Sequence, residues 1–359
     1  MTQPDSTVSA APDQPTLADH GGWSAVLGTL SAGDDIATEV AEAAMGSILA
    51  GEATDAQIAG FIMSLRIKGE SPGEMTGLVR AMQAAATPLE VAEDAIDIVG
   101  VGGAPSRRSH ALNVSTMASI VASAAGARIC KHGNRKASST SGSFDLLEAL
   151  GVAFDVTPEV LAAGIDEARI GFAFARTFHP AMRFVAGVRT ELGVPTVFNL
   201  IGPLSNPGRV IRQVVGVADA ELGARMIEVL KANGSVHSMV VTGDGQLDEF
   251  STTGPTTVHE LRDGSVSTYE VTPESVGIAV ADPEDLRGGD AQANAAIALQ
   301  LFGGAKGPKR DIVVMNAAAG LVVAGIADDL KDGVAKAGAA LDSGAALTKL
   351  DELRASTAS

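Results

Sequence analysis

From residue 96 onward, short runs rich in β-branched residues alternate with glycine-containing turns and alanine-rich stretches of helical composition. Strands that alternate with helices in this way build a parallel or mostly parallel sheet with helices on its faces, which predicts an α/β lobe. Asp263-Gly264, between two further apolar runs, is typical of a hairpin turn and predicts an antiparallel addition to the sheet. The clearest expected strands are 96–100, 170–175, 213–217 and 238–241.

The stretch before this alternation carries helix signals and no strand of its own. Thr54 and Ser71 each precede a Gln or Glu three residues later, which is the capping-box pattern of a helix start. A later stretch, 180–192, begins with Pro and ends before Gly193, so it is also expected to be helical.

These signals predict three regions. Residues 1–20, with many Pro, Ser, Thr and Asp, are expected to form a disordered tail. Residues 21–90, joined by about 180–210, are expected to form an all-helical lobe. Residues 91–359 are expected to form the α/β lobe.

The acidic composition limits the possible partners. With 43 Asp and Glu against 26 Lys and Arg, the formal net charge is −17, which disfavours nucleic acid because the chain repels polyanions. The longest apolar stretch, 312–327, is shorter than the ~20 residues of a spanning helix, so we expect no membrane segment. Cys130 is the only cysteine, and the start of the sequence lacks a signal-peptide pattern, which together predict a cytoplasmic protein.

Glycines follow the first expected strand and lead into an alanine-rich helix. Such a segment makes an anion site, because free backbone N–H groups and the positive end of the helix dipole converge there. A tight turn with a Ser helix cap explains the same pattern equally well, so both interpretations stay open. The residues concerned are Gly100, Gly102, Gly103, Asn113, Ser115 and Thr116.

A group of hydrogen-bond donors follows the expected strand 127–130. Two cations, an imidazole, an amide and several hydroxyls suit a ligand that bears phosphates or a carboxylate. A solvated loop is the alternative interpretation. Cys130 is expected to be a small core residue rather than a nucleophile. The group comprises Lys131, His132, Asn134, Arg135, Ser138 and Ser139.

The sequence F-H-P-A-M-R at 178–183 opens the later helix and is followed by Arg189. At 3.6 residues per turn, His179 and Arg183 share one helix face. Arg189 lies beside that face. It either stacks or pairs on the lobe surface or, within a ligand cleft, offers a planar fork to a carboxylate.

Asp248 and Glu249 lie in a glycine-containing loop after an expected strand. Mg²⁺ prefers oxygen ligands and binds through one or two carboxylates together with substrate phosphates. The same dipeptide occurs at 166–167 and 351–352, but there it falls in helical patterns that are expected to be solvated. The loop position, which we expect to be exposed, favours 248–249 as the cation site.

Taken in order, these segments resemble the anthranilate phosphoribosyltransferase family from about residue 23 to the C-terminus. The resemblance implies a large lobe with a mostly parallel sheet and a smaller all-helical lobe, a nucleoside phosphorylase/phosphoribosyltransferase-like fold. It also implies transfer of the phosphoribosyl group of phosphoribosyl diphosphate (PRPP) to the amine of anthranilate in tryptophan biosynthesis. The motifs are KHGNR at 131–135, FHPAM at 178–182, VFNLIGPLSNP at 197–207, LDEFSTTGPT at 247–256 and GGDAQANAA at 288–296.

The resemblance further implies roles for individual residues and a homodimer that pairs through the helical lobe. Mg²⁺ on the diphosphate would be coordinated by Ser115, Asp248 and Glu249. PRPP would be held by Gly100, Gly102, Gly103, Asn113, Ser115, Thr116, Lys131, Ser138 and Ser139. The aromatic acid would meet His132, Asn134, His179, Arg189 and Pro203. No strong general base is needed, because a neutral aromatic amine is already nucleophilic.

The glycine loop departs from the family pattern Gly-Thr-Gly-Gly-Asp. Val101 replaces the Thr, Ala104 replaces the Asp, and the spacer before Asn113 is three residues longer. The changes remove two polar contacts to PRPP, whereas Arg107 and Arg108 in the new spacer are placed to reach a phosphate. Solvated arginines that pair with surface acids are the alternative.

Three functional interpretations follow. The first is an anthranilate phosphoribosyltransferase with an altered PRPP loop. The second is a paralogue that uses another aromatic or heterocyclic acceptor, or that cleaves nucleosides by phosphorolysis. The third is a non-enzymatic binding protein. The acidic balance and the pair at 248–249 disfavour the third, and Asn134, His179 and Arg189 favour the first over the second.

Overall fold

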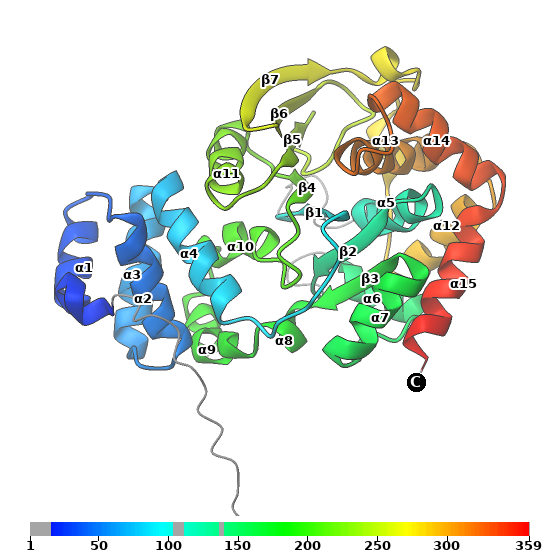
Figure 1. Cartoon of the computed structure of the whole chain (residues 1–359). Coiled ribbons are helices and arrows are strands. Elements are labelled where there is room, and N and C mark those ends of the chain that lie inside the picture. Colours follow the sequence, from blue (N-terminus) through cyan, green and yellow to red (C-terminus); the bar gives the residue numbers. More distant parts are fainter. Residues whose placement is uncertain (1–15, 103–110, 136–139, 359) are drawn as a thin grey trace, which may run out of the picture.

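The computed structural model describes residues 16–102, 111–135 and 140–358. A helical lobe and a larger α/β lobe lie side by side (Figure 1). The first lobe contains α1 (Gly22–Ser31), α2 (Thr38–Leu49), α3 (Asp55–Lys68) and α4 (Pro72–Ala84). It is completed by α9 (Arg183–Leu192) and α10 (Val197–Ile201), whose apolar side chains join the same buried cluster.

Capping residues fix the starts of two of these helices. Thr54 accepts a hydrogen bond from the backbone N–H of Gln57, and Ser71 accepts one from that of Glu74, so both predicted capping boxes are confirmed. At the end of α9, Gly193 has a φ of 65°, a left-handed conformation that glycine adopts without strain.

The expected tail through residue 20 is wrong for its last residues. Leu17–His20 form a 3-10 helix, η1, and Leu17 is buried in the core of the helical lobe. The side chain of Asp19 accepts hydrogen bonds from the backbone N–H and the hydroxyl of Thr16. A Thr followed three residues later by an acidic residue is a helix-start pattern, which the polar composition of this stretch hides.

Seven strands form one sheet in the order β3-β2-β1-β4-β5-β6-β7. Pairing is parallel from β3 through β5 and antiparallel for β6 and β7, which confirms the mostly parallel sheet and the hairpin at Asp263-Gly264. The strands are β1 (Ala95–Gly100), β2 (Arg128–Gly133), β3 (Ile170–Phe174), β4 (Arg212–Gly216), β5 (His237–Gly243), β6 (Thr256–Arg262) and β7 (Ser265–Val271).

Helices cover both faces of the sheet. Ile96 and Ile98 pack with one buried cluster, and Val99 and Val215 pack with the other, which also contains the helical lobe. Because both faces are covered, β1 and β3 are almost continuously apolar, whereas β2 carries Lys131 and His132 near its end. Asp97 is the exception in β1, since it is fully buried.

The remaining helices lie around this sheet (Figure 1). The α-helices are α5 (Val114–Ala124), α6 (Ser143–Ala149), α7 (Pro158–Ala168), α8 (Ala175–Phe178), α11 (Ala220–Ala232), α12 (Ala291–Phe302), α13 (Pro308–Val323), α14 (Leu330–Asp342) and α15 (Ala345–Thr357). The 3-10 helices are η3 (Pro180–Met182), η4 (Gly202–Leu204), η5 (Pro273–Val276) and η6 (Pro283–Leu286).

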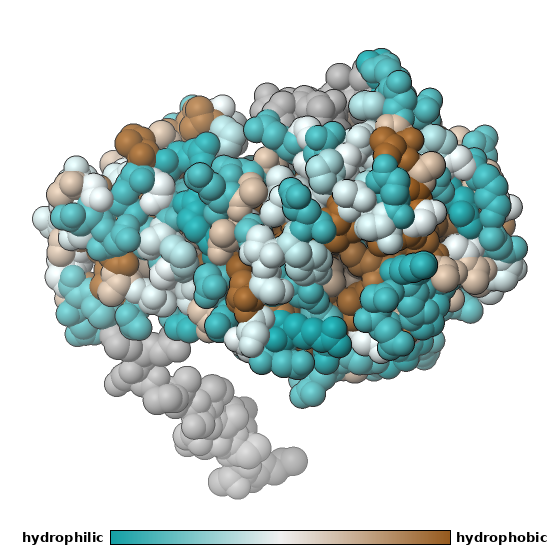
Figure 2. Space-filling view, turned by 90° about the horizontal axis from the view of Figure 1, so that it is seen from above, coloured by the Kyte–Doolittle hydropathy of each residue, from teal (hydrophilic) through white to brown (hydrophobic). Residues whose placement is uncertain are grey.

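Hydrophilic residues are spread over both lobes in the view from above, and hydrophobic residues show mainly right of centre (Figure 2). Among the described helices, none has the length and apolar character needed to cross a bilayer.

Candidate active site

Two of the predicted segments, the glycine loop and the acidic pair, meet where the parallel strands β1 and β4 end. Gly100 and Gly216 are paired at these ends. A Cβ atom on Gly100 would lie 2.6 Å from Asp248 Oδ2, and one on Gly216 would lie 1.8 Å from the Asp248 carbonyl oxygen. The loop that carries Asp248 therefore lies directly on two strand ends that have no side chains.

Burial and a hydrogen bond restrain the acidic pair Asp248-Glu249. Residues 244–246 of the loop are exposed as expected, but Asp248 and Glu249 are half-buried, which corrects the expectation for the acidic pair itself. Asp248 Oδ2 accepts a hydrogen bond from the backbone N–H of Gly102 at 2.8 Å. The copies of this dipeptide at 166–167 and 351–352 are exposed on helices, as expected.

A buried amide on α13 anchors the same loop. Asn316 accepts from the backbone N–H of Phe250 at 3.0 Å and donates to the carbonyl of Phe250 at 3.0 Å. Sequence reasoning missed this residue. An amide inside an otherwise apolar helix was the available signal, because a buried polar group needs hydrogen-bond partners.

The N-terminus of α5 is cross-linked to two other segments through Asn113. Asn113 Oδ1 accepts from Ser141 Oγ at 2.9 Å and from Asn294 Nδ2 at 2.8 Å. Asn294 is fully buried and also donates to the carbonyl of Ala111 at 2.8 Å. Asn294 was another residue missed, although it lies in the GGDAQANAA motif.

Thr116, in the first turn of α5, is almost fully buried, and its hydroxyl has no partner among the residues that the structure describes. Ser115 beside it is half-buried. Both therefore lie where the free backbone N–H groups of the helix also converge.

Lys131 supplies a buried positive charge near the acidic pair. It is 2% exposed, and its Nζ donates to the carbonyl of Ile98 at 2.6 Å. Burial lowers the pKa of Lys131, although the carboxylates of Asp97 and Glu249 oppose this change. The ammonium group of Lys131 thus interacts with Glu249, which is also a predicted ligand of the cation.

His132 and His179 come together from β2 and from the end of α8. Their ring centroids are 5.1 Å apart, and both residues are 5% exposed. His132 Nδ1 lies 3.2 Å from the carbonyl oxygen of Gly202. Burial lowers the pKa of His179, and the backbone of Ser205 opposes this change. In both rings, Nε2 has no partner within the described part of the chain.

The turn that holds these rings is tied to the sheet by buried polar groups. Asn206 Nδ2 donates to Asp97 Oδ2 at 2.9 Å and to the carbonyl of Cys130 at 2.7 Å. The backbone N–H of His132 donates to the same Asp97 oxygen at 3.1 Å. Cys130 is buried and burial raises the pKa of its thiol, so the prediction of a core residue is confirmed.

Arg189 carries a half-buried guanidinium. Its Cζ lies 5.3 Å from the centroid of the Phe198 ring, and no acidic partner is found within the described ranges. Burial lowers its pKa, but a guanidinium stays charged. The structure therefore shows a stacking contact and no ion pair in the described part of the chain, and both interpretations of this residue stay open.

The other predicted acceptor residues differ in exposure. Pro203 is buried in η4, whereas Asn134 is exposed. Arg135, the second cation of the donor group, pairs with Asp145 and Glu148 on α6 and is thereby held on the surface.

Part of the predicted PRPP site falls outside the described residues. This applies to Gly103, Ser138 and Ser139, and to Ala104, Arg107 and Arg108 of the altered loop. Val101 is described, and its side chain packs against the core that includes the helical lobe. The residue that replaces the family Thr thus contributes apolar contact in place of a hydroxyl.

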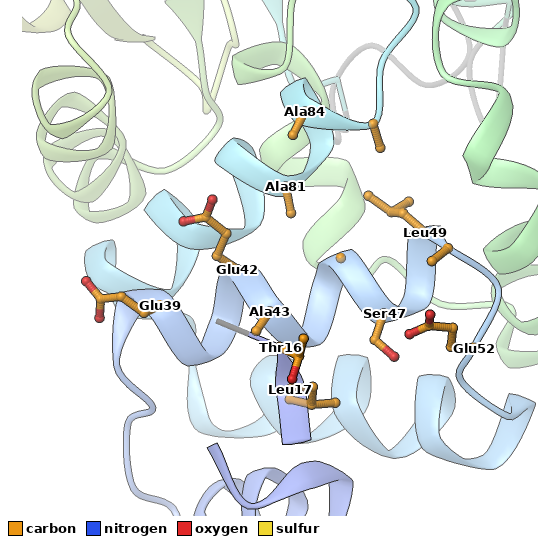
Figure 3. A pocket seen from close by; sticks show the side chains of 13 residues that line it. Thr16, Leu17, Glu39, Glu42, Ala43, Ser47, Leu49, Glu52, Ala81 and Ala84 are labelled. Carbon is orange, nitrogen blue, oxygen red and sulfur yellow. The ribbon is translucent and has the colours of Figure 1, made fainter. Parts of the chain in front are cut away.

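A hollow of about 580 Å³ lies elsewhere, on the helical lobe between α2 and α4 (Figure 3). Small residues such as Ala43, Gly46 and Ala81 form its walls, and Glu39, Glu42 and Glu52 also line it. Among the described residues, its charged lining is acidic and contains no Lys or Arg, so this hollow is unsuited to a phosphorylated ligand.

The histidine pair gives a prediction for stability. Burial lowers the pKa of His132 to about 3 and that of His179 to about 4, from an ordinary value of 6.5. The unfolded chain therefore binds protons first, and stability falls as pH drops below 6.5. We expect the free energy of unfolding to fall by about 2 kcal/mol per histidine between pH 7 and pH 5. His132→Asn and His179→Asn should each remove one such contribution, as measured by urea unfolding at the two pH values.

Asp97 provides a control of opposite sign. Burial raises its pKa to about 6, so its contribution to stability grows as pH falls through that value. Asp97→Asn should therefore steepen the loss between pH 7 and pH 5. Equal slopes in the wild type and all three variants would contradict the assignment of neutral buried histidines.

Comparison with known proteins agrees with this two-lobed arrangement. Residues 24–86 match the glycosyl transferase family, helical bundle domain, and residues 92–347 match the glycosyl transferase family, a/b domain. These matches define a two-domain glycosyl transferase.

Individual relatives narrow the class. The anthranilate phosphoribosyltransferase of Methanosarcina acetivorans is 48% identical over 335 residues, which cover 92% of this chain and 88% of the relative. The structure of the Thermus thermophilus enzyme is 43% identical with a TM-score of 0.88, covering 93% of this chain and 99% of that one. The Saccharomyces cerevisiae enzyme in complex with PRPP and Mg is 27% identical with a TM-score of 0.82, covering 93% and 97%. The chain belongs to the anthranilate phosphoribosyltransferase family.

Proposed function

We propose that this protein transfers the phosphoribosyl group of PRPP to the amine of anthranilate, giving N-(5-phosphoribosyl)anthranilate and diphosphate. One observation carries the proposal. The half-buried pair Asp248-Glu249 lies on the ends of β1 and β4, where Glu249 interacts with the charge of buried Lys131. Two buried, neutral histidines lie by the turn that follows α10, and Arg189 lies over Phe198 of α10. The names of the relatives given above fit a site with two halves, one for PRPP and one for anthranilate.

The phosphate half of the site would hold PRPP. The N-terminus of α5 offers free N–H groups and a positive dipole end to a phosphate, and Lys131 adds a charge. The proposed PRPP residues are Gly100, Gly102, Gly103, Asn113, Ser115, Thr116, Lys131, Ser138 and Ser139.

The donor set fits a magnesium ion that shares its ligands with the substrate. Within the described ranges, no three His, Cys, Asp or Glu side chains are grouped to hold a metal by themselves. Two neighbouring carboxylates held on a side-chain-free edge suit Mg²⁺, which keeps waters and binds substrate phosphates. We propose Ser115, Asp248 and Glu249 as the protein ligands. When bound, Mg²⁺ would neutralise the charge that develops on the diphosphate.

The acceptor half would bind anthranilate. Arg189, half-buried and over Phe198, is suited to the carboxylate, since a charge-assisted hydrogen bond strengthens in a desolvated cleft. The proposed residues are His132, Asn134, His179, Arg189 and Pro203. The enzyme of Saccharomyces cerevisiae has been solved with 4-fluoroanthranilate, an acceptor of this chemical class.

The catalytic contribution of this chain is position and charge. The protein holds the amine behind the ribose carbon that loses diphosphate, which makes the reaction effectively unimolecular. The lowered pKa values of His132 and His179 make both rings poor bases, so they accept hydrogen bonds without removing a proton. A neutral aromatic amine needs no stronger base.

The direct test is an assay of purified protein with PRPP, Mg²⁺ and a panel of aromatic acids. We expect diphosphate release with anthranilate and none with benzoate, which has no amine. Turnover of another aromatic or heterocyclic amine in preference to anthranilate would identify a paralogue with a different acceptor.

Arg189→Ala should raise the KM for anthranilate by about 10- to 100-fold and leave the KM for PRPP nearly unchanged, because a charge-assisted hydrogen bond contributes ~1.5–3 kcal/mol. The matched control is Arg183→Ala on the same helix. Arg183 is exposed and its Cζ lies 4.4 Å from the centroid of the Phe184 ring, so the control also removes a cation–π contact. A larger effect on PRPP than on anthranilate would place Arg189 in the phosphate site.

Two further expectations belong to this proposal. We propose that two chains pair through the helical lobe, as the family resemblance implies. The protein is expected to work in the cytoplasm, which its single buried cysteine fits.

A further inference from the structure

Asp97 is a buried carboxylate for which the reaction described above has no use. It lies in the middle of β1 and is fully buried. A buried charge costs several kcal/mol unless hydrogen bonds stabilise it, so its partners indicate its purpose. Oδ2 accepts from Asn206 and from His132, and Oδ1 has no partner in the described part of the chain.

The two donors belong to two separate parts of the acceptor site. His132 donates its backbone N–H, so this bond fixes the end of β2 where one ring begins. Asn206 follows η4, and its Oδ1 accepts from the backbone N–H of Gly208 at 2.9 Å, so it fixes the 202–208 turn. One carboxylate oxygen therefore fixes the position of the 202–208 turn relative to the end of β2.

The position of the turn relative to the strand determines which ring nitrogen of each histidine carries the hydrogen. A carbonyl oxygen can only accept, so His132 must carry its hydrogen on Nδ1 to bond with Gly202. Burial lowers the pKa of His179 and the backbone of Ser205 opposes this change, as a carbonyl that accepts from a ring N–H does. The buried Nε2 of His179 has no partner among the described residues, so we place this hydrogen on Nδ1. In a neutral ring with Nδ1–H, Nε2 is a hydrogen-bond acceptor at the opposite edge of the ring.

We propose that Asp97 is a positioning residue of the acceptor site: through Asn206 and the backbone of His132 it holds the turn that keeps both histidines in the Nδ1–H tautomer, with both Nε2 atoms as acceptors for the substrate's amine. This inference rests on the proposed function. A primary aromatic amine has two N–H donors, and the pair offers one acceptor to each. A carboxylic acid without an N–H group leaves both acceptors unpaired, which disfavours its binding.

The first test reads the tautomers in the ligand-free protein and does not require turnover. In protein labelled with ¹⁵N-histidine, protonated and unprotonated ring nitrogens give well separated shifts, and single substitutions assign the six histidines. We expect one Nδ1–H tautomer for His132 and His179 in the wild type and mixed tautomers in Asp97→Leu. His259 is the internal control, because its ring bonds to Thr268 and to the Ala220 carbonyl, away from Asp97.

The second test separates the amine from the rest of the acceptor. Asp97→Leu should raise the KM for anthranilate by about tenfold, the effect of one hydrogen bond, and change the KM for PRPP less than about twofold. N,N-dimethylanthranilate has no N–H, so its inhibition constant should change less than about twofold. Asp97→Asn should restore wild-type values, because an amide oxygen can still accept from both donors.

Asn206→Asp gives a second route if Asp97→Leu does not fold. An aspartate here keeps the side-chain volume and the acceptor for Gly208, but it shares one proton with Asp97, so its donor is present only when one of the two carboxyl groups is protonated. We therefore expect the same mixed tautomers and the same KM increase at high pH, where both carboxyl groups are ionised, and wild-type behaviour at low pH. Nε2–H tautomers in the wild type, or unchanged tautomers and KM in both variants, would overturn the proposal. Equal losses for anthranilate and its dimethyl analogue would overturn the amine assignment. Failure of the wild type to use anthranilate would overturn the proposed function and leave the tautomer test standing.

Discussion

Glu249→Gln and Asp248→Asn are each expected to lower kcat/KM by about 10²- to 10³-fold, because each removes a charged ligand whose stabilisation of the diphosphate is worth several kcal/mol. Asp248→Asn keeps an oxygen that can accept from Gly102, so the loop should stay in place and the loss should reflect the missing charge. Steady-state rates over a range of Mg²⁺ concentrations would measure the effect.

The chain provides its own control for these variants. Asp166 and Glu167 form the same dipeptide on the exposed face of α7, so Asp166→Asn and Glu167→Gln change the same charges away from the site. These controls should keep wild-type rates. Full turnover by the 248 and 249 variants at ordinary Mg²⁺ concentrations would remove the metal assignment.

Gly216→Ala should destabilise the protein by ~3 kcal/mol or more and abolish most activity. Its Cβ would lie 1.8 Å from the carbonyl oxygen and 2.3 Å from the carbonyl carbon of Asp248, and these backbone atoms cannot move without displacing the loop. Thermal unfolding and Mg²⁺ titration of the rate would show both effects.

Gly187→Ala is the control, because an added Cβ there meets nothing within 4 Å and the residue is exposed on α9. It should keep or slightly raise the melting temperature, since alanine favours a helix over glycine. A Gly216→Ala protein with normal stability and Mg²⁺ dependence would show that the loop is not held on the strand ends.

Much of the fold follows from local sequence signals. The strand runs, the hairpin at Asp263-Gly264 and the capping boxes at Thr54 and Ser71 each depend on residues close in the chain. The meeting of the glycine loop with the acidic pair was also predictable, because the carboxyl ends of parallel strands lie at one edge of the sheet.

The supporting polar contacts depend on distant residues and could not be predicted in this way. Asn206 is 109 residues from Asp97, and Asn294 is 181 residues from Asn113, so no local pattern links either pair. The surface role of Arg135 likewise depends on Glu148 of α6, which captures its guanidinium. The residue roles assigned to the site and the exact bounds of the lobes stay predictions.

Asn316 anchors the loop of Asp248 and Glu249 to α13 by hydrogen bonds. The 202–208 turn, which contacts His132, is anchored separately through Asp97 and Asn206. In the described part of the chain no residue is common to these two sets of contacts, and β1 and β4 contribute to both, through Asp97 and Gly100 of β1 and through Gln213 and Gly216 of β4. The two halves of the site are therefore held by separate contacts on the same two strands. Grafting a different 202–206 turn can alter the choice of nucleophile while the diphosphate side keeps its geometry, which makes this scaffold a practical starting point for phosphoribosylating other amines.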